Sequence, residues 1–303
     1  MEILSLFILC HNRPDDARLA IRSVLAQSDK AFSLTVSDNS SNDEVQCMIQ
    51  NEYPDVHYVR RLPMLPALEH FNRCIDEVQT GYFCLFHDDD LMGADFVAGF
   101  SEYLQKFPEM IAYACNAHIE SFGKLQQKLS FLSCRNTETI SSPRVLAARY
   151  FSRAQLGIAP FPAYVYSKER IGKLRFEPDG GKYADVTWLL GLSMKGPVLW
   201  ISRPLMTYRI HASNDGATES RRDRLRFLAF IKKNHALLGN AILQDYRCSF
   251  VYKTILKSPD RSHPIRRRIA KAFVKHYRWA RYARLETYQA LAKRVLVKWL
   301  AST

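Results

Sequence analysis

Three consecutive aspartates, Asp88, Asp89 and Asp90, follow the apolar segment YFCLF and come directly after His87. Adjacent carboxylates repel one another, so a folding chain gains nothing by placing them together at the end of a buried strand. Asp88 and Asp90 can share one hard divalent cation, since Mg²⁺ and Mn²⁺ prefer oxygen ligands and keep phosphate oxygens in their shell. The triplet therefore predicts a metal site that serves a diphosphate. The alternative is a solvated acidic turn or a helix N-cap.

The sequence has no glycine-rich loop that could hold a phosphate instead. P-loop and dinucleotide-binding proteins need glycines directly after the first strand. The first glycine of this chain is Gly81. This argues against a nicotinamide enzyme and against a P-loop ATPase, and it leaves phosphate binding to a metal at the acidic triplet.

Strand and helix patterns alternate along the first part of the chain. Continuous apolar runs predict buried strands, and segments with a helical apolar stripe predict helices. The expected strands are 3–9, 32–41, 56–61, 82–90, 110–120, 163–168 and, as a bent strand or strand pair, 198–211. The expected helices are 11–27, 44–53, 68–79, one that begins at 94, and 186–196, with a loop at 176–185. The alternation indicates an α/β fold with a parallel, doubly wound sheet.

Polar residues follow three of the expected strands at the point where each strand ends. They are Asn12, Asp38 and the triplet 88–90. Ligands of doubly wound sheets bind at the carboxyl ends of the strands. We therefore expect these three positions to meet in one ligand site.

Bulk composition is that of a soluble globular protein. The chain has 303 residues, of which 47% are hydrophobic and 24% charged, enough for one large domain or two ordinary ones. Seven cysteines without metal-ligand spacing favour reduced thiols in the cytoplasm. No apolar run approaches the ~20 residues of a transmembrane helix. The opening MEILSLFILC lacks a basic leader and reads as a first strand, not a signal peptide.

Positive charge is concentrated in the last third of the chain. Residues 219–303 hold 21 Lys and Arg against 5 Asp and Glu, whereas the preceding residues are close to neutral. We therefore expect a catalytic domain at 1–218 and a basic, helical C-terminal region at 219–303.

Within this region, residues 261–300 combine helical apolar spacing, many Lys and Arg side chains and interleaved aromatics. This pattern is typical of a helix on an anionic membrane surface, where each basic residue adds roughly 1 kcal/mol. The segment could instead pack its apolar stripe on the catalytic domain. It could also bind nucleic acid, although no nucleic-acid-binding module is visible and the metal site lies in the neutral part.

Four segments, in the same order, resemble motifs of family 2 glycosyltransferases. They are FILCHNRPDDARLAIRSVLAQS, LTVSDNSS, GYFCLFHDDDLM and MTYRIHASNDG, and the resemblance covers residues 1–218. It implies a GT-A fold, with a Rossmann-like, mostly parallel sheet flanked by helices. It also implies inverting, Mn²⁺- or Mg²⁺-dependent transfer of a sugar from a nucleotide diphosphate, typically a UDP-sugar.

The resemblance assigns donor-binding roles to residues at the strand ends. His11 lies where the base packs against the first loop, and Asp38 would accept a hydrogen bond from the base. The alternative for Asp38 is to cap the turn that follows it. The expected donor-binding residues are His11, Asn12, Arg13, Asp38, Asn72, Asp88 and Asp89.

The same resemblance assigns the metal ligands. Asp90 would be the main ligand, Asp88 would lie toward the ribose and the metal, and His211 would approach from the other side. The alternative for His211 is an ordinary, partly buried histidine. His87 is expected to have a positional role rather than to be a ligand.

Asp185 falls where the family has its catalytic base, usually the Asp of a Glu-Asp pair, although Ala184 stands here in place of that Glu. One carboxylate suffices to take the acceptor's proton, and a single in-line attack inverts the anomeric centre. Asp185 could instead be the N-cap of the next helix. Trp188 and Tyr183 could stack on a sugar or pack in the core.

Family analogy and the basic tail together indicate a lipid-linked saccharide acceptor of a bacterial surface polymer such as O-antigen or capsule. The enzyme would then lie at the cytoplasmic face of a membrane as a peripheral protein. A binding module with a degenerate active site is disfavoured, because Asp88, Asp90 and Asp185 are all present.

Overall fold

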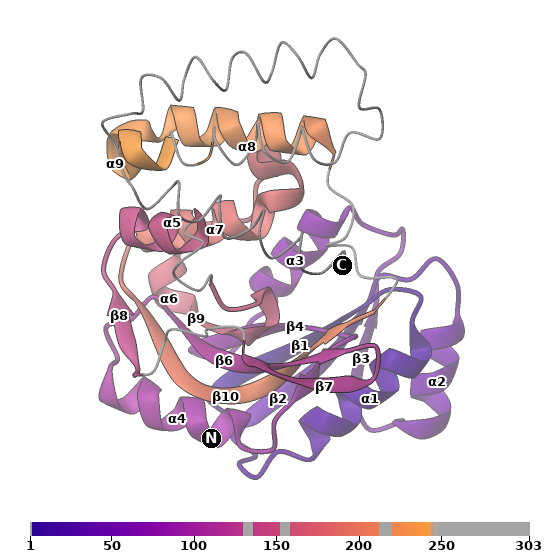
Figure 1. The fold of residues 1–303 in the computed structure, drawn as a ribbon. Helices are drawn as coiled ribbons and strands as arrows, with labels where there is room; N and C mark the ends of the chain where they lie inside the picture. Colours follow the sequence, from indigo (N-terminus) through magenta and orange to yellow (C-terminus); the bar gives the residue numbers. More distant parts are fainter. Residues whose placement is uncertain (1, 130–135, 152–157, 212–219, 244–245, 247–303) are drawn as a thin grey trace, which may run out of the picture.

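The computed structural model of the chain describes residues 2–129, 136–151, 158–211, 220–243 and 246. A central sheet runs through this part of the chain, and helices cover both of its faces (Figure 1). The predicted α/β class, with a mostly parallel sheet flanked by helices, is confirmed. The segment 261–300 lies outside the described residues.

Within the described residues, ten strands form one sheet in the order β3-β2-β1-β4-β9-β6-β10-β5, with β7 beside β6 and β8 beside β10. The strands are β1 Leu4–Cys10, β2 Phe32–Asp38, β3 His57–Arg60, β4 Tyr82–His87, β5 Leu91–Met92, β6 Ala112–Ser121, β7 Lys124–Leu129, β8 Glu138–Ile140, β9 Tyr164–Ser167 and β10 Val198–Ile210. Strands β1 to β4 pair in parallel, and so do β6 and β10. Because β9 is antiparallel to both β4 and β6, these two strands end at the same edge.

The helices form two layers around the sheet. They are α1 Pro14–Leu25, α2 Glu44–Glu52, α3 Ala67–Asp76, α4 Phe96–Lys106, α5 Pro143–Phe151, α6 Lys168–Ile171, α7 Ala184–Ser193, α8 Arg221–Lys233 and α9 His235–Leu238, with 3₁₀ turns η1 Phe161–Ala163 and η2 Pro178–Tyr183. Helices α1, α2 and α4 lie on one face, and α3, α5 and α7 lie on the other, with α8 stacked beyond them (Figure 1). None of the described helices combines the length and apolarity needed to cross a membrane.

The first strand and helix follow directly from their residue types. All seven residues of β1 are buried, because β1 lies between β2 and β4 and beneath helices. The next helix, α1, begins at Pro14, whose fixed φ suits a first turn. Asp15 and Asp16 follow in that turn, where carboxylates interact favourably with the positive end of the helix.

Three differences from the sequence pattern concern the segments around the acidic triplet and Asp185. Strand β4 ends at His87, so the acidic triplet forms a turn into β5 instead of ending the strand. The expected loop at 176–185 contains the turn η2. Helix α7 begins at Ala184 after an N-cap at Tyr183, so Asp185 lies inside the first turn and is not the N-cap.

The segment 198–211 was expected as a bent strand or a strand pair, and it forms the single strand β10. Its pairing with β6 shifts register twice around Pro204. Proline lacks the N–H that a ladder requires and is tolerated at such bulges. Beyond the shifts β10 pairs with both β6 and β5, which brings its carboxyl end beside the acidic triplet.

The first part of the basic region packs against the rest of the fold. Phe227 of α8 is fully buried and stacks on Tyr183, with ring centroids 4.6 Å apart. Gly181, at φ 57°, lies so close to α8 that a Cβ there would stand 2.7 Å from Oδ1 of Asp223. Helix α8 is therefore an integral part of the packed structure, and a domain boundary after residue 218 stays a prediction.

Candidate functional site

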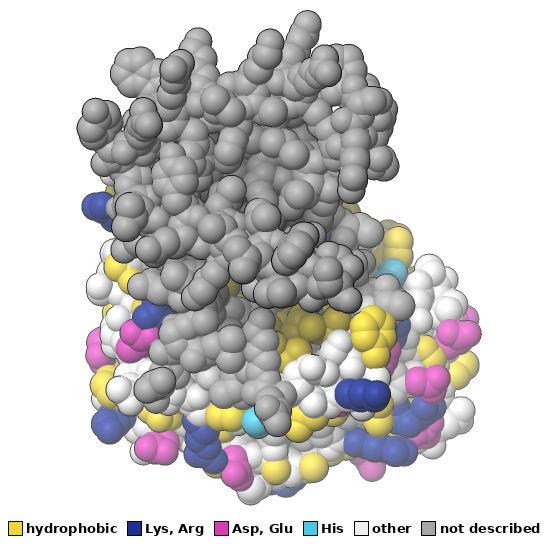
Figure 2. Space-filling model, in the orientation of Figure 1, with side chains coloured by type: hydrophobic (Ala, Val, Ile, Leu, Met, Phe, Trp, Pro, Cys, Tyr) yellow, Lys and Arg dark blue, Asp and Glu magenta, His cyan; other side chains and the backbone are white. Residues whose placement is uncertain are grey.

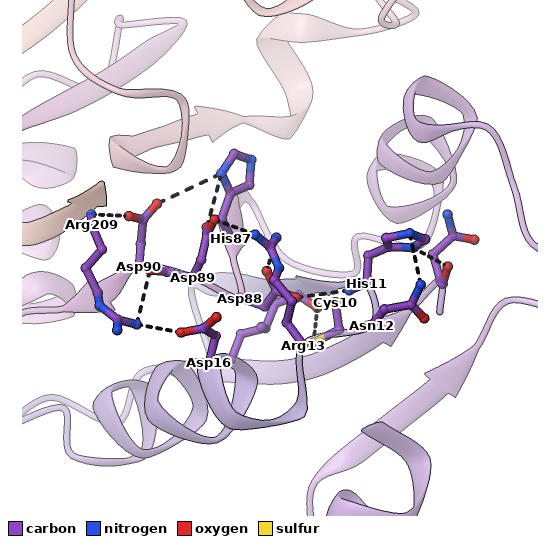
Figure 3. Close-up of polar contacts among 12 residues, drawn as sticks. Cys10, His11, Asn12, Arg13, Asp16, His87, Asp88, Asp89, Asp90 and Arg209 are labelled. Atoms are coloured by element: carbon purple, nitrogen blue, oxygen red, sulfur yellow. Dashed lines mark hydrogen bonds and ion pairs between the residues drawn. The ribbon is translucent and has the colours of Figure 1, made fainter. Parts of the chain in front are cut away.

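The carboxyl ends of β1, β2 and β4 lie side by side and bring three loops together. Cys10 pairs with Asp38 where β1 and β2 end, and Leu9 pairs with His87 where β4 ends. The loop 11–13 therefore lies beside both the turn after β2 and the acidic triplet (Figure 3). This is the meeting point that the sequence predicts.

Asp38 is fully buried, and three donors hold its carboxylate. Its Oδ2 accepts hydrogen bonds from the Tyr58 hydroxyl at 2.6 Å and from Nη1 of Arg60 at 2.7 Å. Its Oδ1 accepts from the main-chain N–H of Ser40 at 2.9 Å, which is the capping contact considered above. Burial, and then Asp38, raise the pKa of Tyr58, so the phenol stays protonated and donates. Asp38 thereby orients Tyr58 and Arg60 at this end of the sheet.

The loop after β1 turns through Asn12, which adopts a left-handed φ of 55° that asparagine tolerates better than most residues. Its main-chain N–H donates to Oγ of Ser40 at 2.8 Å, and its Oδ1 accepts from the N–H of Ser41 at 2.9 Å. These contacts fix the loop against the turn after β2. The N–H of His11 then donates to Oδ2 of Asp88 at 2.9 Å.

Arg13 bridges the first two aspartates of the triplet (Figure 3). Its Nη1 donates to Oδ2 of Asp89 at 2.6 Å, and its Nη2 donates to Oδ1 of Asp88 at 2.5 Å. Burial raises the pKa of Asp88 to about 7, although Arg13 and the N–H of His11 act in the opposite direction. Both oxygens of Asp88 therefore bind the first loop and tie the triplet to it.

His87, Asp89 and Asp90 form the one group in the described part of the chain whose ligand atoms lie close enough to hold a metal, within 4.8 Å of one another. Oδ1 of Asp90 accepts from the N–H of Arg209 at 2.8 Å, but its Oδ2 is buried without a hydrogen-bond partner. That oxygen lies 3.9 Å from Nδ1 of His87. An unpartnered buried carboxylate oxygen is costly. The group therefore fits a hard divalent cation such as Mn²⁺ or Mg²⁺.

Of the three predicted metal ligands, Asp90 lies in this group, and Asp88 and His211 lie beside it. Nε2 of His211 is 3.0 Å from Oδ2 of Asp89, so the imidazole reaches the triplet through that residue. Asp88 is turned toward the first loop. The ring of His87 stacks on Phe161, with centroids 5.2 Å apart, and this contact sets the direction of the imidazole.

The three carboxylates differ in how readily they ionise. Burial, and then the charge of Asp89, raise the pKa of Asp90 well above its ordinary value. Burial acts in the same direction on Asp89, but His87, Arg13 and His211 together lower its pKa. The triplet thus concentrates negative potential that a bound cation would relieve.

Arg209 joins four parts of the structure at the edge of the site. Besides its main-chain bond to Asp90, its Nε donates to Glu120 of β6 at 3.2 Å. Its Nη1 donates to Asp16 of α1 at 3.0 Å and to the carbonyl oxygen of Asp89 at 3.4 Å. The guanidinium therefore links the end of β10 to α1, to β6 and to the acidic triplet.

Asp185 lies in the first turn of α7. Tyr208, beside Arg209 on β10, has its pKa raised to about 12 by burial and then by Asp90, Asp89 and Asp185. One tyrosine is thus in electrostatic range of both the triplet and Asp185. Burial raises the pKa of Asp185 to about 6, against the effect of two main-chain N–H groups. A carboxylate with this pKa is suited to take a proton near neutral pH.

Three further predicted residues have structural partners. Asn72 pairs with the main chain of Phe176: its Nδ2 donates to the carbonyl at 3.0 Å and its Oδ1 accepts from the N–H at 2.8 Å. Trp188 is 3% exposed and stacks on Phe176, with centroids 4.3 Å apart. Tyr183 stacks on Phe227. Trp188 and Tyr183 therefore pack in the core.

The sequence model of glycosyl transferase family 2 matches residues 5–158, half of the chain. The chain belongs to glycosyl transferase family 2. No curated protein sequence matches it. The resemblance to this family is thereby confirmed, and the matched range contains the first three of the four motifs.

Solved structures with the same fold include two glycosyltransferases. TarS 1–349 of S. aureus, in complex with UDP-GlcNAc, has 9% sequence identity, and the match covers 85% of this chain and 74% of TarS 1–349 with a TM-score of 0.62. The mannosyltransferase PcManGT of Pyrobaculum calidifontis, in complex with GDP-Man and Mn²⁺, has 13% identity, with coverage of 97% and 84% and a TM-score of 0.50. At such low identity these matches show the fold alone. The GT-A fold of this family 2 glycosyltransferase is thereby confirmed.

Two residues of the site of this glycosyltransferase, His87 and Arg209, are not predicted from the sequence to take part in its chemistry. The sequence predicts a positional role for His87, whereas in the structure its imidazole faces Asp90. Its position directly before the acidic triplet could have indicated from the sequence that it belongs to the metal site. Arg209 received no role, although it stands in the quoted motif MTYRIH, because its partners Glu120 and Asp16 lie far away in the sequence.

Proposed function

We propose that this family 2 glycosyltransferase moves a sugar from a nucleotide-diphosphate donor to a saccharide hydroxyl, with inversion and with a divalent cation. The observation that carries the proposal is the buried, unpartnered Oδ2 of Asp90 beside His87 and Asp89. The neighbouring loop 11–13 supplies the guanidinium of Arg13, a donor suited to a diphosphate. Metal and phosphate groups would thus meet at one edge of the sheet.

The residues that would hold the cation centre on Asp90. Family resemblance adds Asp88 and His211 to it, and the geometry adds His87 and Asp89. Bound there, Mn²⁺ or Mg²⁺ would act as a Lewis acid that offsets the charge developing on the leaving diphosphate.

The nucleobase subsite is proposed between His11 and the Tyr58–Arg60 pair that Asp38 orients. Nδ1 of His11 lies 2.8 Å from the carbonyl oxygen of Asn39, and this contact holds the imidazole ring beside the turn that follows β2. We propose UDP as the carrier. TarS and PcManGT were solved with UDP-GlcNAc and GDP-Man, so the fold accommodates either base.

The remaining donor-binding residues are proposed to act at the phosphates and the sugar. Arg13 would exchange its contacts with Asp88 and Asp89 for contacts with the diphosphate, because a bound cation satisfies those carboxylates. Asn12 would hold the loop in the conformation that this exchange requires. Asn72 would act through Phe176, whose main chain it fixes.

Asp185 is proposed as the base that takes the proton of the attacking acceptor hydroxyl. Its pKa of about 6 keeps it ionised at neutral pH while leaving it a stronger base than an exposed carboxylate. A single base and an in-line attack would invert the anomeric centre.

The acceptor is proposed to be a lipid-linked saccharide in the assembly of a bacterial surface polysaccharide, at the cytoplasmic face of a membrane. The support is the basic composition of 219–303 and the basic, aromatic-rich sequence 261–300. Anionic lipid would attract both, and the site would then face acceptors anchored in the same surface.

A thermal-shift screen tests the proposed function. Nucleotide diphosphates and nucleotide sugars are added to the full chain, each with and without Mn²⁺, since a bound ligand raises the melting temperature by mass action. We expect one uridine nucleotide to stabilise the protein only with Mn²⁺. No shift with any nucleotide, together with a shift caused by an oligonucleotide, would overturn the proposal in favour of nucleic-acid binding.

A further inference from the structure

The β6–β7 hairpin turns through Phe122 and Gly123. Ser121 pairs with Lys124, so the loop between the strands has two residues. Both have positive φ, 49° at Phe122 and 74° at Gly123, as a type I′ turn requires. Glycine adopts this conformation freely, and asparagine is usual at the first position, whereas a bulky aromatic residue is a steric outlier. The turn itself therefore does not explain a phenylalanine at 122.

The ring of Phe122 points into solvent rather than into the core. Its side chain is 72% exposed, and that of Leu125 on the same hairpin is 64% exposed. The N–H of Phe122 donates to the carbonyl of Ile210 at 3.0 Å, and Ile210 is itself 37% exposed. Leu125 pairs with Glu120 and Ile210 pairs with Ser121, so these two side chains lie on opposite faces of the sheet, with Phe122 at the end of the hairpin. A costly backbone conformation that presents an exposed apolar side chain at such an end indicates a surface built for contact.

The chemistry around the tip is basic and apolar. Lys124 follows the turn directly, and the nearby acidic residue, Glu120, is paired with Arg209. Figure 2 shows hydrophobic side chains with basic ones close by, on the face where Figure 1 places the tip of this hairpin. Apolar groups accompanied by lysines are the pattern of a surface that inserts into an anionic lipid interface.

The tip lies at the same edge of the sheet as the acidic site. Ile210 directly follows Arg209, whose N–H binds Asp90. The loop after β3 reaches the same edge, because β3 is parallel to β2. It exposes 76% of Leu62 and 51% of Met64. Exposed apolar side chains thus lie on two loops at the edge of the sheet that carries the acidic site. A flat lipid surface could contact both loops at once.

We propose that the hairpin tip, formed by Phe122, Leu125 and Ile210, docks the enzyme on an anionic lipid surface with the acidic site facing that surface. The proposed contact is made by residues other than the segment 261–300. The inference rests on the proposed function in one respect: docking would bring a lipid-anchored acceptor close to the acidic triplet. The lipid contact itself requires no catalysis.

The variant Phe122→Asn separates a docking role from a structural one. Asparagine suits the left-handed conformation, so we expect the melting temperature of the full chain to be equal or higher. Co-sedimentation with phosphatidylglycerol-rich vesicles should fall by about tenfold, because a large apolar side chain no longer leaves water. The matched control is Leu25→Ser, at the end of α1 and 41% exposed, which should leave vesicle binding unchanged.

Three outcomes would overturn the inference. One is unchanged vesicle binding of the full-length Phe122→Asn variant at both low and high salt. The second is a lower melting temperature, which would mean that the ring packs in the fold. The third is a changed oligomeric state with unchanged vesicle binding, which would identify a second copy as the occupant. Mn²⁺-dependent nucleotide shifts of the variant should equal those of the wild type, so a failure of the proposed function is recognised separately.

Discussion

The main-chain N–H of Arg209 donates to Oδ1 of Asp90 at 2.8 Å, while Oδ2 of the same carboxylate is buried without a hydrogen-bond partner. One oxygen is thus fixed by the end of β10, and the other is left for a ligand. This division gives Asp90 a defined orientation before any cation arrives. It also predicts that both Asp90 and the strand that orients it control metal affinity.

Asp90→Asn is expected to abolish the Mn²⁺-dependent stabilisation by nucleotide. The amide keeps an oxygen for the N–H of Arg209 but removes the charge that a divalent cation requires. Thermal shifts with and without Mn²⁺ measure the effect, and Asp15→Asn, a 92% exposed side chain, is the charge-matched control. Retention of the Mn²⁺-dependent shift in Asp90→Asn would place the metal elsewhere.

Arg209→Ala is expected to weaken metal affinity by roughly tenfold, the effect of losing a residue that orients a ligand. The substitution keeps the main-chain bond to Asp90 but removes the links to Glu120 and Asp16. Titration of Mn²⁺ in the presence of saturating nucleotide measures it. Arg203→Ala, on the same strand and paired with Asp95, is the control and should stay close to wild type. If both variants weaken metal affinity equally, Arg209 contributes to the stability of the fold and does not specifically orient the metal site.

The sequence predicts the parts of the site that depend on local pattern. The apolar runs of β1 and β4 and the helical pattern after Pro14 locate the strand ends, and those ends carry Asn12, Asp38 and the triplet. The carboxyl-edge rule then brings these positions together without further information. Family motifs supply the roles, but only for residues that the motifs contain.

The rest of the site depends on pairings between distant segments. Arg209 meets Glu120 across 89 residues only because β10 pairs with β6 in one register. Asn72 meets Phe176 across 104 residues, which no local pattern indicates. The direction of the His87 ring is set by Phe161. Such contacts are properties of the packed structure, so periodicity and composition could not reveal them.

Asp185→Asn is expected to leave nucleotide binding intact and to lower sugar transfer by roughly 10²- to 10⁴-fold, the usual effect of losing a general base. The amide cannot take the acceptor's proton, whereas the proposed donor site is formed by other residues. Transfer is measured with the nucleotide sugar that stabilises the protein and the acceptor that it uses. Transfer at the wild-type rate would show that another group is the base.

The pH profile of wild-type transfer should report the same carboxylate. The pKa of Asp185 is raised to about 6, so its ionised form increases as the pH rises through 6. The value of kcat/KM should therefore rise toward a plateau above that pH, provided that the metal stays saturating. A profile that is flat between pH 5 and pH 8 would contradict the assignment.

His70 should make the stability of the protein depend on pH. Its ring is 4% exposed, and its Nε2 lies 2.7 Å from Oγ of Ser37. Burial, and then the charge of Arg61, lower its pKa from 6.5 to about 4. Asp38 and Glu77 act in the opposite direction but do not outweigh these effects. Between about pH 6.5 and pH 4, His70 is therefore neutral in the folded protein but protonated in the unfolded chain.

The sign of the effect follows from proton binding in the two states. Below about pH 6.5 the unfolded chain takes up a proton on this histidine, and the folded chain does so only near pH 4, so the free energy of unfolding falls as the pH drops between these values. The full loss is on the order of 3 kcal/mol. Urea unfolding of the wild type and of His70→Gln, which removes the titrating group and can keep a bond to Ser37, measures it at each pH. The difference between the two proteins should shrink steadily from pH 6.5 to pH 4. Parallel curves for both proteins would show that carboxylates, not His70, cause the acid sensitivity.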